Sequence, residues 1–241
     1  MVFFFAISLP VMLVTGKGDM PMWLARRAWA PWGLWLAGCR LDARIVAPLP
    51  DGPAIFAANH ESTIDIWALV ATIPRGVRFV AKAELFRIPI FGWYMALGGH
   101  VPIERKDRAR AIASLELAAR KIRSGTSIIV YPEGTRSHDG RVHAFKKGPF
   151  ALAEKAGVPV VPVAVVGAGK VTPKNLLHVH PGTITVVLGE AVRPADFPGR
   201  DELLREVRRR IIALHRDAGG LGGDLEHAVA ARGQEGDVGA D

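Results

Sequence analysis

His60 and Asp65 are the two residues whose types and spacing best suit chemistry. His60 follows an apolar run at residues 54–58 that predicts a buried strand, and residues 66–70 predict the start of a helix. In open α/β sheets, active sites collect where strands end and helices begin. A carboxylate beside an imidazole fixes the ring's tautomer and stabilises the imidazolium that forms when the ring takes a proton. The pair is therefore a candidate general base.

The spacing of this pair sets a geometric condition. On one regular helix, residues five apart are rotated by roughly 140° and do not face each other. The pair works only if His60 lies in the turn before the helix and Asp65 reaches back from its first turn. Ser62 and Thr63 are the predicted N-cap residues of that helix. A purely structural hydrogen bond is the alternative, so other parts of the chain are needed to choose between the two.

A second candidate site follows another apolar strand, predicted at residues 127–131. It comprises Glu133, Gly134, Thr135 and Arg136. Gly134 permits a tight turn or a close approach to a ligand. Thr135 and Arg136 offer hydrogen-bond donors, and a guanidinium binds phosphate in a bidentate manner. Taken alone, the stretch could equally be a solvated surface turn.

Further cations lie at other predicted strand ends. Lys82 ends a strand predicted at residues 77–81, and Arg105 follows a short strand. Residues 145–148, Phe-Lys-Lys-Gly, add charge before the N-terminus of a helix, which is itself an anion site. We expect these strand ends to meet at one edge of the sheet together with His60. One base and several cations there would suit activation of a hydroxyl on a phosphate-bearing molecule.

The elements that must position these residues alternate along the chain. The predicted strands cover residues 41–47, 54–58, 77–81, a short segment within 99–105, 127–131, 160–166 (interrupted by Pro162) and 183–188. The predicted helices cover residues 84–97 (broken at Ile88-Pro89), 106–123, a segment that follows residues 145–148 and ends near Gly157, and 201–215. Such alternation predicts a single α/β domain, residues 39–215, with a mixed, largely parallel sheet flanked by helices.

The N-terminal 38 residues differ from this core. Residues 1–14 carry no charged side chain, yet they are fewer than the ~20 needed to span a bilayer as a helix. They also lack the features of a signal peptide. Residues 22–38 combine four tryptophans with Arg26 and Arg27, which is typical of the membrane–water interface. We therefore expect residues 1–38 to form a membrane-associated helical hairpin that dips into one leaflet. A helix pair packed on the core is the alternative.

The net charge of +8 over 241 residues indicates an anionic partner. The basic residues lie in several places and do not form one long run interleaved with aromatics, which favours a membrane surface and a phosphate site over nucleic acid. The single cysteine, Cys39, excludes an internal disulfide, and no Cys/His ligand spacing predicts a metal site. Residues 216–241 hold two basic and six acidic side chains and many glycines. We expect this tail to be disordered.

Four ordered blocks between about residues 40 and 200 resemble those of the glycerolipid acyltransferases. The matching stretches are Asn59-His60 with Asp65 (the family's NHxxxxD block), Gly99 to Arg105, Tyr131 to Ser137 (the EGTR block) with Phe145 to Gly148 after it, and Val158 to Val163. Lys82 to Leu85 and Pro89 to Gly92 also resemble the family. The chain looks like a 1-acyl-glycerol-3-phosphate acyltransferase of the bacterial type.

The resemblance implies a reaction. His60 would take the proton from the sn-2 hydroxyl of lysophosphatidate, and Asp65 would orient His60 and stabilise its charged form. The hydroxyl oxygen would attack the thioester of acyl-CoA or acyl-carrier protein directly, giving phosphatidate for phospholipid biosynthesis. No cofactor beyond this co-substrate is implied, and the expected location is the cytoplasmic face of the inner membrane, among membrane lipids.

The resemblance also assigns the binding residues. Arg136, with Gly134 and Thr135, would hold the acceptor phosphate, and Lys82 and Arg105 would assist. Glu133 would organise this loop. The family's second block here carries Pro102 and Glu104 where many members have an aromatic residue and Asp. Because this block contributes to acceptor recognition, another lyso-lipid, such as a lyso-ornithine lipid, stays an alternative acceptor.

Two other classes of function remain to be weighed. A non-catalytic, basic membrane-binding module would fit the charge and the N-terminal segment, but it would not depend on His60. A nucleotide-phosphate binder is disfavoured because the chain has no G-x-x-x-x-G-K-[ST] loop.

Overall fold

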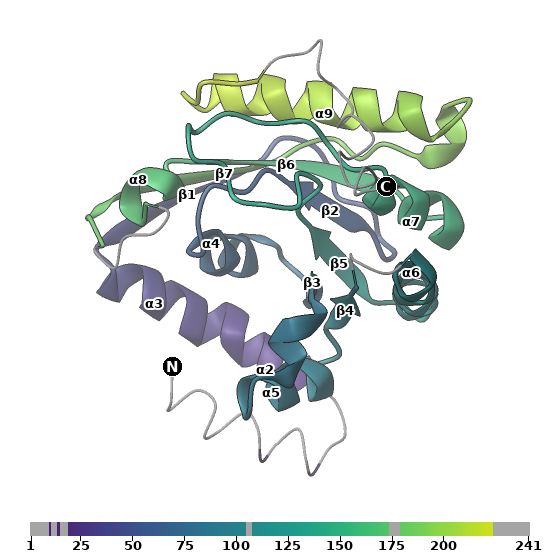
Figure 1. Cartoon of the computed structure of the whole chain (residues 1–241). Helices are drawn as coiled ribbons and strands as arrows, with labels where there is room; N and C mark the ends of the chain where they lie inside the picture. Colours follow the sequence, from purple (N-terminus) through teal and green to yellow (C-terminus); the bar gives the residue numbers. More distant parts are fainter. Residues whose placement is uncertain (1–9, 11–13, 15–18, 105–107, 174–178, 224–241) are drawn as a thin grey trace, which may run out of the picture.

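The described residues form a seven-stranded sheet in the order β1-β7-β6-β2-β5-β3-β4 (Figure 1). The structure is a computed structural model, and it describes residues 10, 14, 19–104, 108–173 and 179–223. Its strands are β1 (Cys39–Ile45), β2 (Ile55–Ala58), β3 (Val77–Lys82), β4 (Val101–Ile103), β5 (Ser127–Val130), β6 (Val160–Val166) and β7 (Gly182–Leu188).

Five neighbouring strands run in the same direction. β2 is parallel to both β5 and β6, β3 is parallel to β5, and β4 is parallel to β3. β7 is antiparallel to β6 and carries β1 parallel to itself at the edge. The prediction of a mixed, largely parallel sheet is therefore confirmed. The carboxyl ends of the five parallel strands share one edge, as expected for His60 and the other candidate residues.

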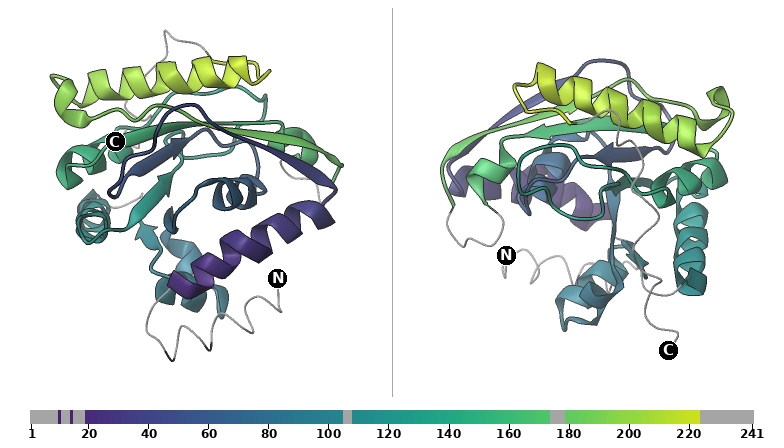
Figure 2. Two further views of the ribbon diagram at one scale, coloured as in Figure 1. Left: turned by 180° about the vertical axis from the view of Figure 1, so that it is seen from behind. Right: turned by 45° about the horizontal axis from the view of Figure 1, so that its top comes forward.

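Helices cover both faces of this sheet (Figure 2). They are α2 (Asp19–Leu24), η1 (Ala25–Trp29), α3 (Ala30–Leu36), α4 (Asp65–Thr72), η2 (Ala83–Arg87), α5 (Phe91–Leu97), α6 (Arg108–Arg123), α7 (Gly148–Ala156), α8 (Ala168–Val171), η3 (Pro194–Asp196) and α9 (Arg200–Asp217). α6, α7 and α9 contribute to the hydrophobic core on one face, and α3, α4 and α8 contribute to the core on the other.

β2 shows why this layering follows from the sequence. All four of its residues are buried. Successive side chains of a strand point to opposite faces, and Ile55 and Ala57 accordingly pack beneath α9 and α7, whereas Phe56 and Ala58 pack on the α4 side. An apolar run without alternation is what a strand needs when helices cover both faces. The strand that leads into His60 is thus completely buried.

The second arm of the predicted N-terminal hairpin is a helix packed on the core. α2, η1 and α3 follow one another from Asp19 to Leu36 and bury Met22, Ala25, Ala30 and Leu34. These buried side chains fit the alternative in which the N-terminal helices pack on the core. Trp23, Trp32 and Trp35 of the same segment are nevertheless exposed. The first arm lies outside the described residues, apart from positions 10 and 14. No helix in the described part of the chain has the length and apolar character of a membrane-spanning segment.

The structure differs from the sequence prediction at β6 and at the end of the domain. Pro162 does not interrupt β6, because it lies one residue before the β6–β7 ladder begins and its carbonyl accepts the Gly189 amide. The missing N–H of the proline therefore breaks no bond of that ladder. The ordered C-terminal region also extends beyond residue 215. α9 runs to Asp217, and Gly223 pairs with Val142. The rest of the predicted tail, residues 224–241, lies outside the described residues.

Candidate active site

His60 and Asp65 meet in the geometry that the sequence required. β2 ends at Ala58, α4 begins at Asp65, and His60 lies in the turn between them. The imidazole Nδ1 is 2.7 Å from the Asp65 Oδ2. Because a carboxylate accepts, this contact places the imidazole hydrogen on Nδ1 and leaves Nε2 free to accept a proton. The pair has the arrangement of a general base held by an acid residue.

The predicted N-cap is not formed, and Asp65 instead binds the turn that precedes the helix. No side chain caps the start of α4. Instead, the Asp65 Oδ2 accepts the backbone amides of Glu61 at 2.9 Å and Ser62 at 3.0 Å. The Ser62 hydroxyl donates elsewhere, to the Thr172 carbonyl at 2.8 Å. The turn that carries His60 is therefore wrapped around the same carboxylate that orients its ring.

The carboxyl group of Asp65 is completely buried, while the His60 side chain is 17% exposed. Burial raises the pKa of Asp65 above its ordinary value, and the hydrogen bonds from His60 and from the Ser62 amide oppose that rise. The exposed part of His60 gives a substrate access to the ring. The arrangement thus pairs an accessible base with a shielded orienting group.

The main chain and the ring of His60 are fixed from β5 and the loop after it. The imidazole stacks on the Tyr131 ring with centroids 3.8 Å apart and planes at 15°. The His60 amide donates to the Glu133 Oε1 at 3.0 Å, and its carbonyl accepts the Ser137 amide at 2.7 Å. Held in this way, the base loses little conformational freedom when it reacts.

The Glu133 carboxylate connects its own loop to the backbone of His60. Its second oxygen, Oε2, accepts the His143 amide at 3.0 Å, so both oxygens receive backbone donors. Burial raises the pKa of Glu133 to about 7, although the hydrogen bonds from the His143 and His60 amides oppose the shift. Glu133 thereby joins the two ends of the loop at residues 134–143 to the backbone of the base.

Sequence reasoning missed two anchors that flank His60. The Asn59 side chain forms two buried hydrogen bonds with the backbone of Val165 in β6. The buried Glu61 carboxylate accepts the Gly169 amide at 3.0 Å, and its other oxygen lies 3.2 Å from the His215 Nε2. The signals in the sequence were the place of Asn59 in the NHxxxxD block and the adjacency of Glu61 to His60. Their partners lie more than 100 residues away.

The predicted phosphate-binding residues are partly assembled. Gly134 has a φ of +77°, which its lack of a Cβ permits. The Arg136 Nη1 lies 3.2 Å from the Thr63 Oγ1, which places the guanidinium against the turn of His60. Thr135 is exposed in the same loop, and Lys82 is exposed at the end of β3. The binding roles of these residues stay predictions.

The role of one further cation stays a prediction, and another cation is already paired. Arg105 lies outside the described residues. The Lys147 Nζ forms an ion pair with Asp201 at 2.7 Å, so its charge is already matched at the start of α9. Phe145, in the same motif, is completely buried in the core.

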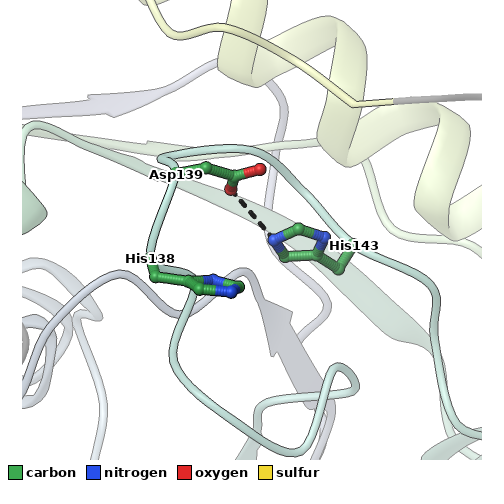
Figure 3. A group of neighbouring side chains, drawn as sticks. All are labelled: His138, Asp139 and His143. Carbon is green, nitrogen blue, oxygen red and sulfur yellow. Dashed lines mark hydrogen bonds and ion pairs between the residues drawn. The ribbon is translucent and has the colours of Figure 1, made fainter.

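The described residues contain one group of at least three side chains with ligand atoms close enough to share a metal ion (Figure 3). The group consists of His138, Asp139 and His143, and it lies on the loop that Glu133 closes. The sequence predicts no metal site here, because the spacing of these residues matches no familiar ligand motif. The turn at Asp139-Gly140 brings them together.

Comparisons with known proteins agree with this site. A family model described as Acyltransferase matches residues 41–166. A 1-acyl-sn-glycerol-3-phosphate acyltransferase of Chlamydomonas reinhardtii is 40% identical over 148 residues, which are 61% of this chain and 44% of the relative. One from Pseudomonas aeruginosa is 34% identical over 169 residues, 68% of this chain and 65% of the relative. The chain spans about half the length of the first curated relatives that it matches.

A solved structure agrees with the fold as well. The crystal structure of the 1-acyl-sn-glycerophosphate acyltransferase PlsC from Thermotoga maritima is similar, with a TM-score of 0.68 and 31% identity. The match covers 82% of this chain and 78% of that chain. The family match includes His60, Asp65 and the loop of Glu133, the residues that the fold assembles at one sheet edge. The chain belongs to the acyltransferase family.

Proposed function

We propose that this protein transfers an acyl chain from an acyl thioester to the sn-2 hydroxyl of 1-acyl-glycerol-3-phosphate. The observation that carries the proposal is the 2.7 Å contact between the His60 Nδ1 and the buried Asp65 carboxylate. It leaves Nε2 as the proton acceptor at the accessible side of the ring. The names of the relatives supply the acceptor, since they are 1-acyl-sn-glycerol-3-phosphate acyltransferases.

In this reaction, His60 moves one proton twice. As the hydroxyl oxygen of the acceptor attacks the thioester carbonyl, its proton passes to the His60 Nε2 and a tetrahedral intermediate forms. Collapse of the intermediate breaks the carbon–sulfur bond, and the thiolate takes the proton back from the imidazolium. Asp65 stabilises the imidazolium between these steps. No acyl-enzyme is needed.

Arg136 is the residue best placed to hold the acceptor phosphate. Its contact with Thr63 keeps the guanidinium beside the turn of His60, and a guanidinium matches the geometry of a phosphate. Lys82 at the end of β3 adds a further positive charge on the same edge of the sheet. The donor can be acyl-CoA or acyl-carrier protein, because both present the same thioester.

We further propose that the helix from Asp19 to Leu36 attaches the protein to the cytoplasmic face of the inner membrane. Trp32 is 65% exposed and Trp35 is 69% exposed. Together with Arg27, they line a surface hollow of about 500 Å³. Exposed tryptophans beside arginine suit the headgroup region of a bilayer. Replacing Trp32 and Trp35 by Gln tests this without removing the buried face of the helix, and undiminished binding to anionic vesicles would contradict it.

The function is tested with an acyl-transfer assay of the purified protein in detergent. Acyl-CoA, and separately acyl-carrier protein, is offered with lysophosphatidate or with a lyso-lipid that lacks the phosphate, such as a lyso-ornithine lipid. The expected result is product from lysophosphatidate, lost in His60→Ala and reduced in Arg136→Ala. Product from the phosphate-free acceptor alone would overturn the acceptor and the role of Arg136. No product with either donor would leave a non-catalytic membrane-binding module as the better reading.

A further inference from the structure

We propose that His138, Asp139 and His143 bind a divalent transition-metal cation of the zinc class (Figure 3). The three residues belong to one loop between β5 and α7, which also includes Arg136. The site is separate from the base and from its orienting carboxylate. The inference therefore goes beyond acyl transfer and does not depend on it.

The donor set and its spacing carry the proposal. The ligand atoms of the three side chains all lie within 4.8 Å of one another, and the His143 Nε2 is 2.9 Å from the Asp139 Oδ1. In a tetrahedral zinc site, bonds of ~2.0–2.1 Å place neighbouring ligand atoms about 3.3 Å apart. Two of the ligands are thus already near that separation. The third ligand, His138, is exposed, and its ligand atom lies within 4.8 Å of the other two.

Two of the three ligands are held by partners of their own. The Asp139 Oδ1 accepts the Ser137 hydroxyl at 2.9 Å and the Arg141 amide at 3.0 Å. Hydrogen bonds of this kind orient the ligands of known metal sites. Because the carboxylate is fixed before a metal arrives, binding costs less ordering of the loop.

His143 is fixed through its backbone. Its amide donates to the Glu133 Oε2, and its carbonyl accepts the buried Arg208 Nε at 3.0 Å. The neighbouring residue, Val142, pairs with Gly223. The imidazole of His143 therefore projects from a stretch of backbone anchored on both sides, which is the support that a metal ligand needs.

The chemistry of the ligands selects the metal class. Mg²⁺ and Ca²⁺ prefer all-oxygen sites, whereas imidazole nitrogens favour Zn²⁺, Co²⁺, Ni²⁺ and Cu²⁺. Two imidazoles and one carboxylate leave at least one coordination position open for water. A plain ion pair between His143 and Asp139 is the competing explanation, and it requires no metal.

A bound cation would act on the loop that supports the base. It would join His138 to His143. His138 follows Ser137, whose amide donates to the His60 carbonyl. The His143 amide donates to the Glu133 carboxylate. Both ends of the loop would then be cross-linked. We therefore expect the metal to raise the thermal unfolding midpoint of the protein, a result that is read without any substrate.

The test uses the full chain without a histidine tag, purified in detergent and freed of metal with a chelator. Equilibrium dialysis against ZnCl₂, with metal analysis of the protein, gives the affinity. The variants are His138→Ala and His143→Ala, and the matched control is His180→Ala, an exposed histidine outside the group. We expect the wild type and the control to bind one Zn²⁺ more than either site variant, or to bind it at least about 10-fold more tightly.

Thermal unfolding with and without ZnCl₂ gives a second readout. We expect stabilisation of the wild type and of His180→Ala, and none of His138→Ala, whose exposed side chain can be removed without disturbing the core. Equal zinc binding and equal stabilisation in the wild type and in His138→Ala would overturn the site. Stabilisation of the same size by MgCl₂ would overturn the assignment to the zinc class.

Discussion

The side chain of Asn59 forms two hydrogen bonds with the backbone of Val165, accepting its amide at 2.7 Å and donating to its carbonyl at 2.8 Å. β2 ends at Ala58, and this bridge continues its pairing with β6 by one further residue. It fixes the backbone immediately before the candidate base. The amide side chain thus takes the place of a further ladder pair at the point where the chain must turn.

Replacing Asn59 by Ala should lower both stability and turnover. The substitution leaves the buried amide and carbonyl of Val165 without their partners, which costs about 1–3 kcal/mol of the free energy of unfolding. Denaturant unfolding measures this loss, with Ser124→Ala as the control because its hydroxyl makes an exposed hydrogen bond. We expect a change within about 0.5 kcal/mol for the control. Equal effects of the two substitutions would contradict the role of the bridge.

Replacing Asp65 by Asn should separate charge from geometry. The Oδ2 accepts three hydrogen bonds, and the Oδ1 has no partner among the described residues. An Asn can therefore place its side-chain oxygen where Oδ2 lies and its amide nitrogen where Oδ1 lies. The fold and the Nδ1 contact should survive, but the charge that stabilises the imidazolium is lost. We expect kcat to fall roughly 10²-fold or more with an unchanged unfolding midpoint, and unaltered kcat would refute the role of Asp65.

Glu133 should link stability to pH, because burial raises its pKa from the ordinary 4.5 to about 7. Below pH 4.5 the carboxyl is protonated in both the folded and the unfolded state. Between pH 4.5 and about 7 the unfolded chain releases this proton while the folded protein keeps it. The free energy of unfolding therefore falls as the pH rises through this window, by up to about 3 kcal/mol from this group, and it levels off above pH 7.

The measurement compares the wild type with Glu133→Gln, which cannot titrate at this position. As the pH rises from 4.5 to 7, the free energy of unfolding of the wild type should fall relative to that of Glu133→Gln. Other titrating groups cancel in this difference. A difference that is constant with pH would show that the pKa of Glu133 is not raised.

Tyr131 should act through its ring and not through its hydroxyl. The hydroxyl is buried without a hydrogen-bond partner among the described residues, and burial raises the pKa of the phenol well above its usual range. Tyr131→Phe removes an unsatisfied group, so stability should be unchanged or higher by up to about 1 kcal/mol, and acyl transfer should persist. Tyr131→Ala removes the stacking partner of His60 and should cost about 3 kcal/mol. Loss of activity in Tyr131→Phe would instead assign the hydroxyl a chemical role.

Gly33 should be required for the packing of α3 on α4. A Cβ at this position would lie 2.8 Å from two ring atoms of Trp67, whereas a Cβ at Gly52 would meet no atom within 4 Å. We expect Gly33→Ala to destabilise the protein by about 1–3 kcal/mol, and Gly52→Ala to have little effect. Thermal unfolding of both variants checks this. Equal midpoints would show that Trp67 can move aside at no cost.

Sequence patterns were reliable where the cause is local. The break of the helix predicted at residues 84–97 appears as η2 followed by α5, because Pro89 cannot continue a helix. The N-cap of α4 was misjudged, because the Ser62 hydroxyl donates to the distant Thr172 carbonyl and no side chain caps the helix. The strand predicted at residues 41–47 begins two residues earlier, at Cys39. The predicted end of the domain at residue 215 was also too early, since the chain beyond α9 returns to Val142 through a bridge that no local pattern announces.

The sequence by itself determined the strand, the turn and the helix start that allow His60 and Asp65 to meet, because these elements follow from local apolar patterns. It also determined which strands are buried, because their apolar runs do not alternate. Only the tertiary structure decided what surrounds the base. The strand order places β2 between β5 and β6, which brings Glu133 to His60 across 73 residues and Val165 to Asn59 across 106. Such contacts depend on which strands become neighbours, and that choice is made by the packing of the whole core and not by any one segment.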